Sequence, residues 1–141
     1  MANRSERLEQ LSAVPLFRSS SKRELEKIAR AADEVIVEAG RVLVTQGEIG
    51  RECYVIVSGE ASVSRDGKEI AKLGAGEPIG ELAVLDGGPR TATVTALTEL
   101  DLLVIGQREF SALLTEVPGL AHKIMVNLAA RVRDLDERVY G

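Results

Sequence analysis

Residues 54–70 of the chain are Tyr-Val-Ile-Val-Ser-Gly-Glu-Ala-Ser-Val-Ser-Arg-Asp-Gly-Lys-Glu-Ile, and this stretch indicates the fold class. Within it, Asp66-Gly67 lies between Val63 and Ile70 in an alternating apolar pattern. Both turn residues tolerate the positive φ that a type I′ turn requires. The stretch therefore predicts two antiparallel strands joined by a tight hairpin turn at Asp66-Gly67.

Glycines recur at short, regular intervals in the surrounding chain. Between residues 33 and 106 they occur at positions 40, 47, 50, 59, 67, 74, 76, 80, 87, 88 and 106. Short runs of β-favouring residues lie between them, at 41–45, 54–57, 61–64, 91–96 and 101–105. Short β-favouring runs separated this regularly by glycines predict an antiparallel all-β barrel or sandwich over about residues 33–106.

Both flanks of this region have helical patterns instead. Residues 4–13 and 21–32 predict two short N-terminal helices, within about residues 4–32, that pack on the barrel. Ser21 followed by Glu24 forms a capping-box pattern at the start of the second helix. The apolar residues of that helix recur at helical spacing: Leu25, Ile28, Ala29 and Ala32.

The C-terminal flank predicts one short and one long helix, within about residues 108–140. Residues 108–115 have a helical pattern, Pro118 can begin a second helix, and residues 119–140 contain no further breaker. Two apolar stripes follow this long helix: Leu120, Ile124, Leu128, Val132, Leu135 and Val139 in one, and Ala121, Met125 and Ala129 in the other. One stripe is expected to face the barrel, and the second favours a homodimer through this helix over a monomer.

Length, charge and hydropathy limit the possible functions. With 141 residues, 45% of them hydrophobic, the chain is predicted to be a single domain, residues 1–141. Its net charge of -4 argues against binding of nucleic acid by the chain as a whole. The first ten residues are polar, and no apolar run approaches the roughly 18 residues of a membrane span. We expect a cytoplasmic protein that does not enter a membrane.

The residues of common catalytic sites are scarce. Cys53 is the only cysteine and His122 the only histidine, so neither an internal disulfide nor a histidine-rich metal site can form. A metal-dependent barrel enzyme of the cupin type would need several histidines. Cys53 lies in a β-run and is expected to be a packing residue rather than a nucleophile. The sequence therefore predicts a protein that is not an enzyme and has no catalytic residue, no metal and no cofactor.

The segment with the most specific chemistry is residues 80–94, Gly-Glu-Leu-Ala-Val-Leu-Asp-Gly-Gly-Pro-Arg-Thr-Ala-Thr-Val. A short helix or turn that begins at Gly80 would leave backbone N–H groups without intrahelical partners, and small neighbours would let an anion approach them. Arg90 could bind a phosphate by two parallel hydrogen bonds, and Glu81 could accept from a neighbouring hydroxyl. The alternative is an internal ion pair between Glu81 and Arg90, which needs no ligand.

This segment closely resembles the phosphate-binding cassette of the cyclic nucleotide-binding domain family. The first half of the family pattern, Gly-Glu-Leu-Ala, matches residues 80–83, and the second half, Pro-Arg-Thr-Ala, matches residues 89–92 at the usual separation. The resemblance extends over nearly the whole chain through Gly47, Tyr54, Ile56, Gly59, Val63 and the pair Leu16-Phe17. It implies a mainly β fold: an antiparallel jelly-roll β-barrel with N-terminal helices and a long C-terminal helix.

The resemblance also implies roles for the cassette. Glu81 would accept from the ribose 2′-hydroxyl, and Arg90 would pair with the cyclic phosphate. Backbone N–H groups near Leu82, Ala83 and Thr91 would assist. The complete phosphate and ribose set that it implies is Gly80, Glu81, Leu82, Ala83, Arg90, Thr91 and Ala92.

The purine base would lie against barrel side chains and be covered by the C-terminal helix. Val63 and Leu73 are similar to the barrel residues of the family, and Arg131 and Leu135 to its lid residues. A solvated arginine and a core or interface leucine remain the alternatives for those last two. The family associates a hydroxyl at the position of Thr91 with acceptance of guanine as well as adenine, and the alternative is an ordinary strand residue.

One departure concerns the residues before the cassette. The family often has an aromatic residue just ahead of the Gly-Glu pair, whereas this chain has Pro78-Ile79. Because isoleucine is apolar, we expect altered packing beneath the cassette rather than loss of the site.

The function that follows is a regulatory sensor that binds cAMP, or alternatively cGMP, and moves its C-terminal helix on binding. Well-known bacterial relatives continue into a helix-turn-helix domain, for which only Gly141 remains after Tyr140. We therefore expect a stand-alone sensor rather than the sensor half of a longer transcription regulator. A ligand-free protein-interaction domain of the same fold is the third possibility. No pattern identifies an effector protein.

Overall fold

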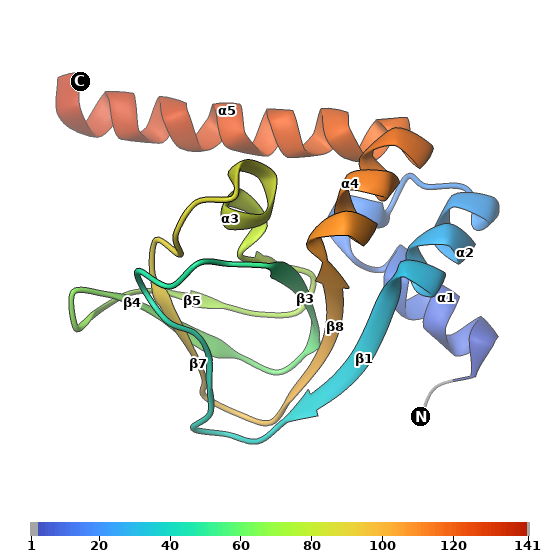
Figure 1. Ribbon diagram of the computed structural model, residues 1–141, viewed down its shortest axis with the longest axis horizontal. Coiled ribbons are helices and arrows are strands. Elements are labelled where there is room, and N and C mark those ends of the chain that lie inside the picture. The colour runs from blue at the N-terminus through green and yellow to red at the C-terminus, as the bar shows by residue number, and fades with distance from the viewer. Residues whose placement is uncertain (1–2, 141) are drawn as a thin grey trace.

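Two four-stranded antiparallel sheets form the centre of the computed structural model, which describes residues 3–140 (Figure 1). One sheet has the order β1-β8-β3-β6 and the other β2-β7-β4-β5. Their strands are β1 (Ala32–Val37), β2 (Val42–Val44), β3 (Glu52–Ser58), β4 (Ala61–Arg65), β5 (Lys68–Leu73), β6 (Pro78–Ile79), β7 (Thr93–Ala96) and β8 (Leu100–Gly106). This arrangement confirms the predicted mainly β fold with antiparallel pairing.

The hairpin turn lies where the sequence predicts it. β4 and β5 pair from Ala61↔Leu73 to Arg65↔Lys68, and the turn between them consists of Asp66 and Gly67. Both have positive φ, 54° and 81°, as a type I′ turn requires. Asp66 is also the only described non-glycine residue with positive φ, and its amide donates to the side-chain oxygen of Gln46 at 2.9 Å.

Strand β8 is buried on both of its faces. Leu100 and Leu102 belong to the core between the two sheets, together with Ile56 of β3. Leu103 and Ile105 belong to a second core between the outer face of this sheet and the helices. The nearly continuous apolar run at 100–105 is explained by this double burial, because a strand covered on one face only would alternate with polar residues.

Helices cover the outer face of the β1-β8-β3-β6 sheet (Figure 1). They are α1 (Arg4–Ser12), the 3-10 turn η1 (Pro15–Phe17), α2 (Lys22–Ala31), α4 (Gln107–Glu116) and α5 (Pro118–Tyr140). The capping box of α2 is confirmed: the amide of Glu24 donates to Ser21 Oγ at 3.1 Å, and the amide of Ser21 donates to Glu24 Oε1 at 2.8 Å. Helix α2 ends one residue earlier than predicted, because Ala32 pairs with Ile105 of β8 and begins β1.

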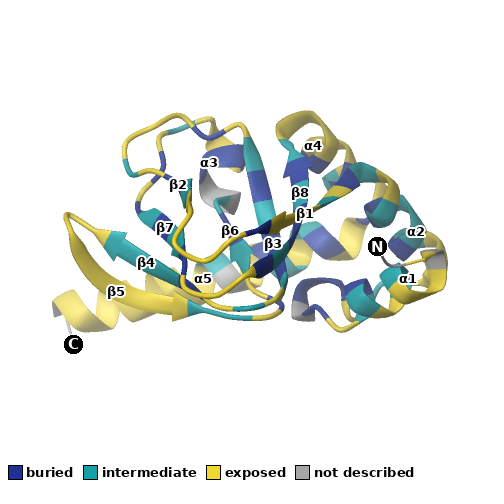
Figure 2. Ribbon diagram, turned by 90° about the horizontal axis from the view of Figure 1, so that it is seen from below, coloured by how far each residue is buried: buried dark blue, intermediate teal, exposed yellow. Residues whose placement is uncertain are grey.

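The 23-residue helix α5 extends beyond the core (Figure 1). Its length is about 34 Å at 1.5 Å per residue. Leu120 and Ile124 are buried, whereas Val132, Leu135 and Val139 are exposed, and the second half of the helix is mostly exposed in Figure 2. The expectation that the first stripe faces the barrel along its whole length is therefore wrong beyond residue 128. No helix within residues 3–140 has the length and apolarity that crossing a bilayer requires.

Candidate functional site

A cavity of about 450 Å³ lies between the β2-β7-β4-β5 sheet, the cassette helix α3 (Glu81–Asp86) and helix α5. Figure 1 shows α3 beneath α5 and beside the end of the barrel. The size falls within the roughly 300–1,000 Å³ of small-molecule sites. Its described lining residues are Val44, Val63, Ile70, Ala71, Leu73, Pro78, Ile79, Gly80, Ala83, Arg90, Thr91, Ala92, Val94, Arg131 and Asp134. Apolar walls with a few convergent charged groups are typical of a ligand-binding site.

Helix α3 forms one edge of this cavity, and two glycines set its limits. Gly80 precedes it with φ 80°, and Gly87 follows it with φ 69°. Both angles lie in the left-handed region that side chains with a Cβ rarely adopt. The amide of Gly87 donates to the carbonyl of Ala83 at 2.9 Å and closes the helix. The predicted short helix at Gly80 is confirmed, and its first-turn N–H groups have no partner within the helix.

Arg90 lines the cavity and is buried, with 8% of its surface exposed. Its Nη2 donates to the carbonyl oxygen of Glu52 at 2.8 Å and its Nη1 to that of Gly80 at 3.4 Å. These carbonyls orient the guanidinium but do not neutralise it. Its positive charge thus lies buried at the wall of the cavity. Such a charge favours an anionic ligand.

Two glycines make room for this guanidinium. A Cβ at Gly50 would lie 2.6 Å from Arg90 Cζ and 2.8 Å from the Cβ of Ala83, and a Cβ at Gly80 would collide with Arg90 Nη1. The sequence indicated the importance of Gly80 but not that of Gly50. In the sequence, Gly50 could be noticed only as a glycine that lies outside any predicted turn. The packing between Gly50 and Arg90 depends on the pairing of Ile49 with Pro89 across the fold.

Tyr54 is connected to Arg90 through Glu52. Tyr54 Oη donates to Glu52 Oε1 at 2.8 Å, and the carbonyl of Glu52 accepts from Arg90. Burial raises the pKa of Tyr54 to about 12, with smaller contributions from the hydrogen bond and charge of Glu52. The phenol is thus protonated at physiological pH and can donate to Glu52.

Glu81 and Leu82 form the first turn of α3, but their side chains lie outside the residues that the structure describes. Acceptance of a ribose hydroxyl by Glu81 therefore stays a prediction. The alternative ion pair between Glu81 and Arg90 likewise stays a hypothesis.

The structure brings most of the predicted base-binding residues to the cavity. Val63 and Leu73 line it, and so do Thr91 and Ala92 at the cassette. From α5 it is Arg131 that lines the cavity, whereas Leu135 is exposed and does not.

Asp134 takes the place that was expected for Leu135. It lines the cavity three residues after Arg131, and its Oδ2 also pairs with Arg138 Nη2 at 3.0 Å. Residues three and four apart both share a helix face with Arg131, so periodicity alone does not distinguish Asp134 from Leu135. The rotation of α5 about its axis turns Asp134 toward the cavity and leaves Leu135 exposed.

Pro78-Ile79 is the point at which the chain departs from the family pattern. Ile79 is buried in the core between the sheets, pairs with Tyr54 and lines the cavity. An apolar residue thus packs beneath the cassette.

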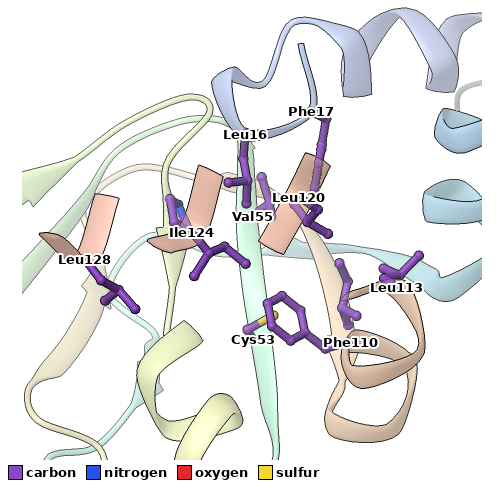
Figure 3. Close-up of a pocket in the computed structure, with 11 residues that line it drawn as sticks. Leu16, Phe17, Cys53, Val55, Phe110, Leu113, Leu120, Ile124 and Leu128 are labelled. Atoms are coloured by element: carbon purple, nitrogen blue, oxygen red, sulfur yellow. The ribbon is translucent and has the colours of Figure 1, made fainter. Parts of the chain in front are cut away.

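A second, much smaller cavity of about 20 Å³ lies among α4, α5, η1 and β3 (Figure 3). Its walls are apolar, including Phe17, Phe110 and Ile124, and its volume is about that of one water-sized probe. Cys53 lies buried in this wall, which fits a packing residue. Among the side chains that the structure describes, no cluster of three from His, Cys, Asp or Glu could hold a metal ion.

Comparison with protein families identifies one match. The model of the "Cyclic nucleotide-binding domain" family matches residues 34–116, which include both sheets except the first residues of β1, all of the cassette and α4.

Individual relatives agree with this match. A cyclic nucleotide-gated potassium channel of Rhizobium etli is 39% identical over 114 residues, which are 81% of this chain and 32% of the channel. The catabolite activator protein of Thermus thermophilus superposes with a TM-score of 0.83 at 29% identity, over 89% of this chain and 61% of that one. The regulatory domain of Toxoplasma gondii PKA, crystallised with cAMP, has a TM-score of 0.70 at 33% identity, over 80% of this chain and 46% of that one. The chain thus spans about a third of the channel's length.

Proposed function

The chain belongs to the cyclic nucleotide-binding domain family, and we propose that it is a non-catalytic regulatory domain that binds cAMP or, alternatively, cGMP. The observation that carries this proposal is the buried guanidinium of Arg90 at the α3 side of a cavity of about 450 Å³ with largely apolar walls. A cyclic nucleotide combines one negative charge with a large flat base. The charge suits the guanidinium of Arg90, and the base suits the apolar walls.

The ligand would bind in two parts. The cyclic phosphate pairs with Arg90 and accepts from the amides of Leu82, Ala83 and Thr91. Glu81 accepts from the ribose 2′-hydroxyl. An arginine fork matches two phosphate oxygens at once, and hydrogen bonds of this charged kind are about twice as strong as neutral ones. Gly80 and Ala92 leave room for the phosphate close to the backbone.

The base would lie between the barrel and α5. Val63 and Leu73 contact one side of the purine, and Arg131 of α5 covers it. Asp134 presents a carboxylate acceptor to the amino groups of either base, and Thr91 offers a hydroxyl to guanine. We propose cAMP as the first ligand, supported by the cAMP in the Toxoplasma structure.

Helix α5 is the element that the ligand would move. Because it contributes Arg131 and Asp134 to the cavity, a ligand that contacts them binds more tightly when α5 lies in place. A ligand shifts a conformational equilibrium only by its difference in affinity for the two states. Contacts with α5 would supply that difference here.

Calorimetric titration of the purified chain with cAMP and with cGMP tests this proposal. We expect micromolar or tighter dissociation constants, and 5′-AMP serves as the control that lacks the cyclic phosphate. The ratio of the two affinities identifies the preferred base. Absence of binding heat, from folded protein shown by mass spectrometry to be free of co-purified nucleotide, would contradict the proposal and favour a ligand-free interaction domain.

We also propose that α5 joins two copies of the chain. Its apolar residues Met125, Leu128, Val132, Leu135 and Val139 follow one another at intervals of 3, 4, 3 and 4. Four of them are 59–69% exposed, while Leu128 packs against the core. This heptad spacing, with Met125, Val132 and Val139 at a positions and leucines at d positions, is typical of parallel two-stranded coiled coils.

Leu135→Asp is expected to convert this dimer into a monomer, because a carboxylate at a central d position would be buried against its symmetry mate. Light scattering after size exclusion, at tens of micromolar chain, measures the mass. Ala130→Asp adds the same charge at an exposed position of the same helix outside the heptad seam and should leave the dimer intact. A monomeric wild-type chain at that concentration would refute the dimer.

A second candidate function is that of the sensor part of a longer transcription regulator. It is favoured by the likeness to the Thermus catabolite activator protein and to the N-terminal domain of a Streptomyces coelicolor transcriptional regulator, which is 34% identical with a TM-score of 0.70. Immunoblotting of the native polypeptide distinguishes the two, since the 141 residues have a mass of 15.2 kDa and a regulator would be larger. Immunoblotting of cell fractions likewise tests the proposed cytoplasmic location.

A further inference from the structure

A cluster of polar side chains connects α1 to the outer face of the β1-β8 strand pair. Arg7 of α1 donates from Nη2 to Glu34 Oε1 of β1 at 2.8 Å, and the two side chains are only 15% and 8% exposed. Asp101 of β8 completes the cluster. None of these residues lines the 450 Å³ cavity, so the proposed ligand does not account for them.

The strand register places the two carboxyl groups on the same face. Glu34 lies opposite Leu103, and Ile36 lies opposite Asp101, so Glu34 and Asp101 are diagonal neighbours. Leu103 of this face packs in the core beneath the helices. Asp101 and Glu34 therefore meet at the margin of that core, under α1.

The cluster contains one cation and two carboxyl groups, and its hydrogen bonding is incomplete. Among the described residues, Asp101 Oδ1 and Arg7 Nε are buried without a hydrogen-bond partner, and so is Gln10 Oε1 of α1. A second ionised carboxylate beside Glu34 would have no cation of its own. A contact between two carboxyl groups becomes a hydrogen bond only when one of them is protonated.

The surroundings of Asp101 favour the protonated form. Burial, together with the hydrogen bond and charge of Glu34, raises its pKa to about 6, and the charge of Arg7 partly opposes this rise. Strand β3, on the other side of β8, places the uncharged Ser58 opposite Asp101. The charged groups acting on Asp101 are thus Glu34 from β1 and Arg7 from α1.

We propose that Arg7, Glu34 and Asp101 form a proton-operated latch, in which a proton shared by the two carboxyl groups holds α1 more firmly on the sheet at mildly acidic pH. Loss of this proton near neutral pH leaves two carboxylates to compete for one guanidinium and loosens α1. Helix α1 packs on η1, and η1 packs on α5, so the latch belongs to the same helical layer as the helix that borders the cavity.

The direction of the pH effect follows from linkage. The folded chain holds this proton more tightly than the unfolded chain, in which an aspartate titrates near pH 4. The contribution of the latch to the free energy of unfolding is therefore full below about pH 4, decreases as the pH rises to about 6, and is lost above that.

Urea unfolding and amide hydrogen exchange between pH 5 and 8 test the latch without any nucleotide. All chains carry His122→Asn, which removes the only histidine of the sequence from the comparison. In the otherwise wild-type chain we expect the protection factors of the α1 amides to fall at least about fivefold from pH 5 to 8, with a parallel fall in the urea midpoint. Asp101→Asn should remove this pH dependence and raise the midpoint at pH 8.

Two further variants complete the design. Asp33→Asn, at an exposed aspartate of the same strand pair, should keep the wild-type pH dependence. Glu34→Gln should lower the midpoint at pH 5, because Arg7 loses its partner, and should reduce the pH dependence without removing it, because burial still raises the pKa of Asp101. The latch is refuted if Asp101→Asn retains the wild-type slope, or if the protection of α1 does not change with pH in the chain that keeps Asp101.

Discussion

Arg90→Ala is expected to weaken binding of cAMP and cGMP strongly while the chain stays folded. The guanidinium is buried and is oriented by the carbonyls of Glu52 and Gly80, so the cyclic phosphate would lose its charged partner inside a desolvated site. Loss of one member of such a pair costs about 2–5 kcal/mol. That corresponds to a loss of affinity of about 30-fold to several thousandfold, measured by calorimetric titration.

Arg90→Lys is the matched control. It keeps the positive charge but has a single ammonium group in place of the fork, so its affinity should lie between those of the wild-type chain and Arg90→Ala. Circular dichroism of both variants checks that the fold persists. Binding by Arg90→Ala within threefold of wild type would show that Arg90 does not bind the ligand, even if the chain proves to be a nucleotide sensor.

Gly50→Ala is expected to weaken nucleotide binding through Arg90 without contacting the nucleotide. The added Cβ would lie 2.6 Å from Arg90 Cζ and Nε and 2.8 Å from the Cβ of Ala83, so the guanidinium and α3 must both shift. The arginine side chain is flexible at its end and yields more readily than packed backbone. We therefore expect affinity to fall at least about tenfold, or 1.4 kcal/mol, with a smaller loss of thermal stability.

Gly74→Ala is the control for this substitution. A Cβ at Gly74 meets no atom within 4 Å, and the residue lies outside the positive-φ region. This variant should bind as the wild-type chain does and unfold at the same temperature or slightly above it. If Gly50→Ala bound nucleotide as tightly as Gly74→Ala, the narrow space around Arg90 would have no role in recognition.

Several elements could be predicted from the sequence because their causes are local. The capping box of α2 depends on two residues three apart, and the turn at Asp66-Gly67 depends on two adjacent residues that tolerate positive φ. The same holds for the short helix between Gly80 and Gly87. Element boundaries were less accurate: Ala32 continues the helical pattern of α2, but its pairing with Ile105 places it in β1.

The residues of the candidate site likewise fall into those that the sequence identifies and those that only packing brings to the cavity. Its cassette is continuous in sequence, so residues 80–92 could be identified together, and the structure brings Gly80, Ala83, Arg90 and Thr91 to one cavity. The contribution of α5 could not be assigned so well. The choice between Asp134 and Leu135 depends on how the helix is rotated about its axis, which packing of Leu120 and Ile124 against the core decides.

The amino-acid order thus determines where strands, turns and caps form and which short segment has the chemistry of a phosphate site, because each depends on neighbours a few residues away. The tertiary structure alone decides that Gly50 faces Arg90, that α5 brings Asp134 to the cavity, and that Arg7 pairs with Glu34 of β1 near Asp101 of β8. These contacts join residues that are distant in the chain. They exist only after packing of the two cores has set the register of the strands and the rotation of the helices.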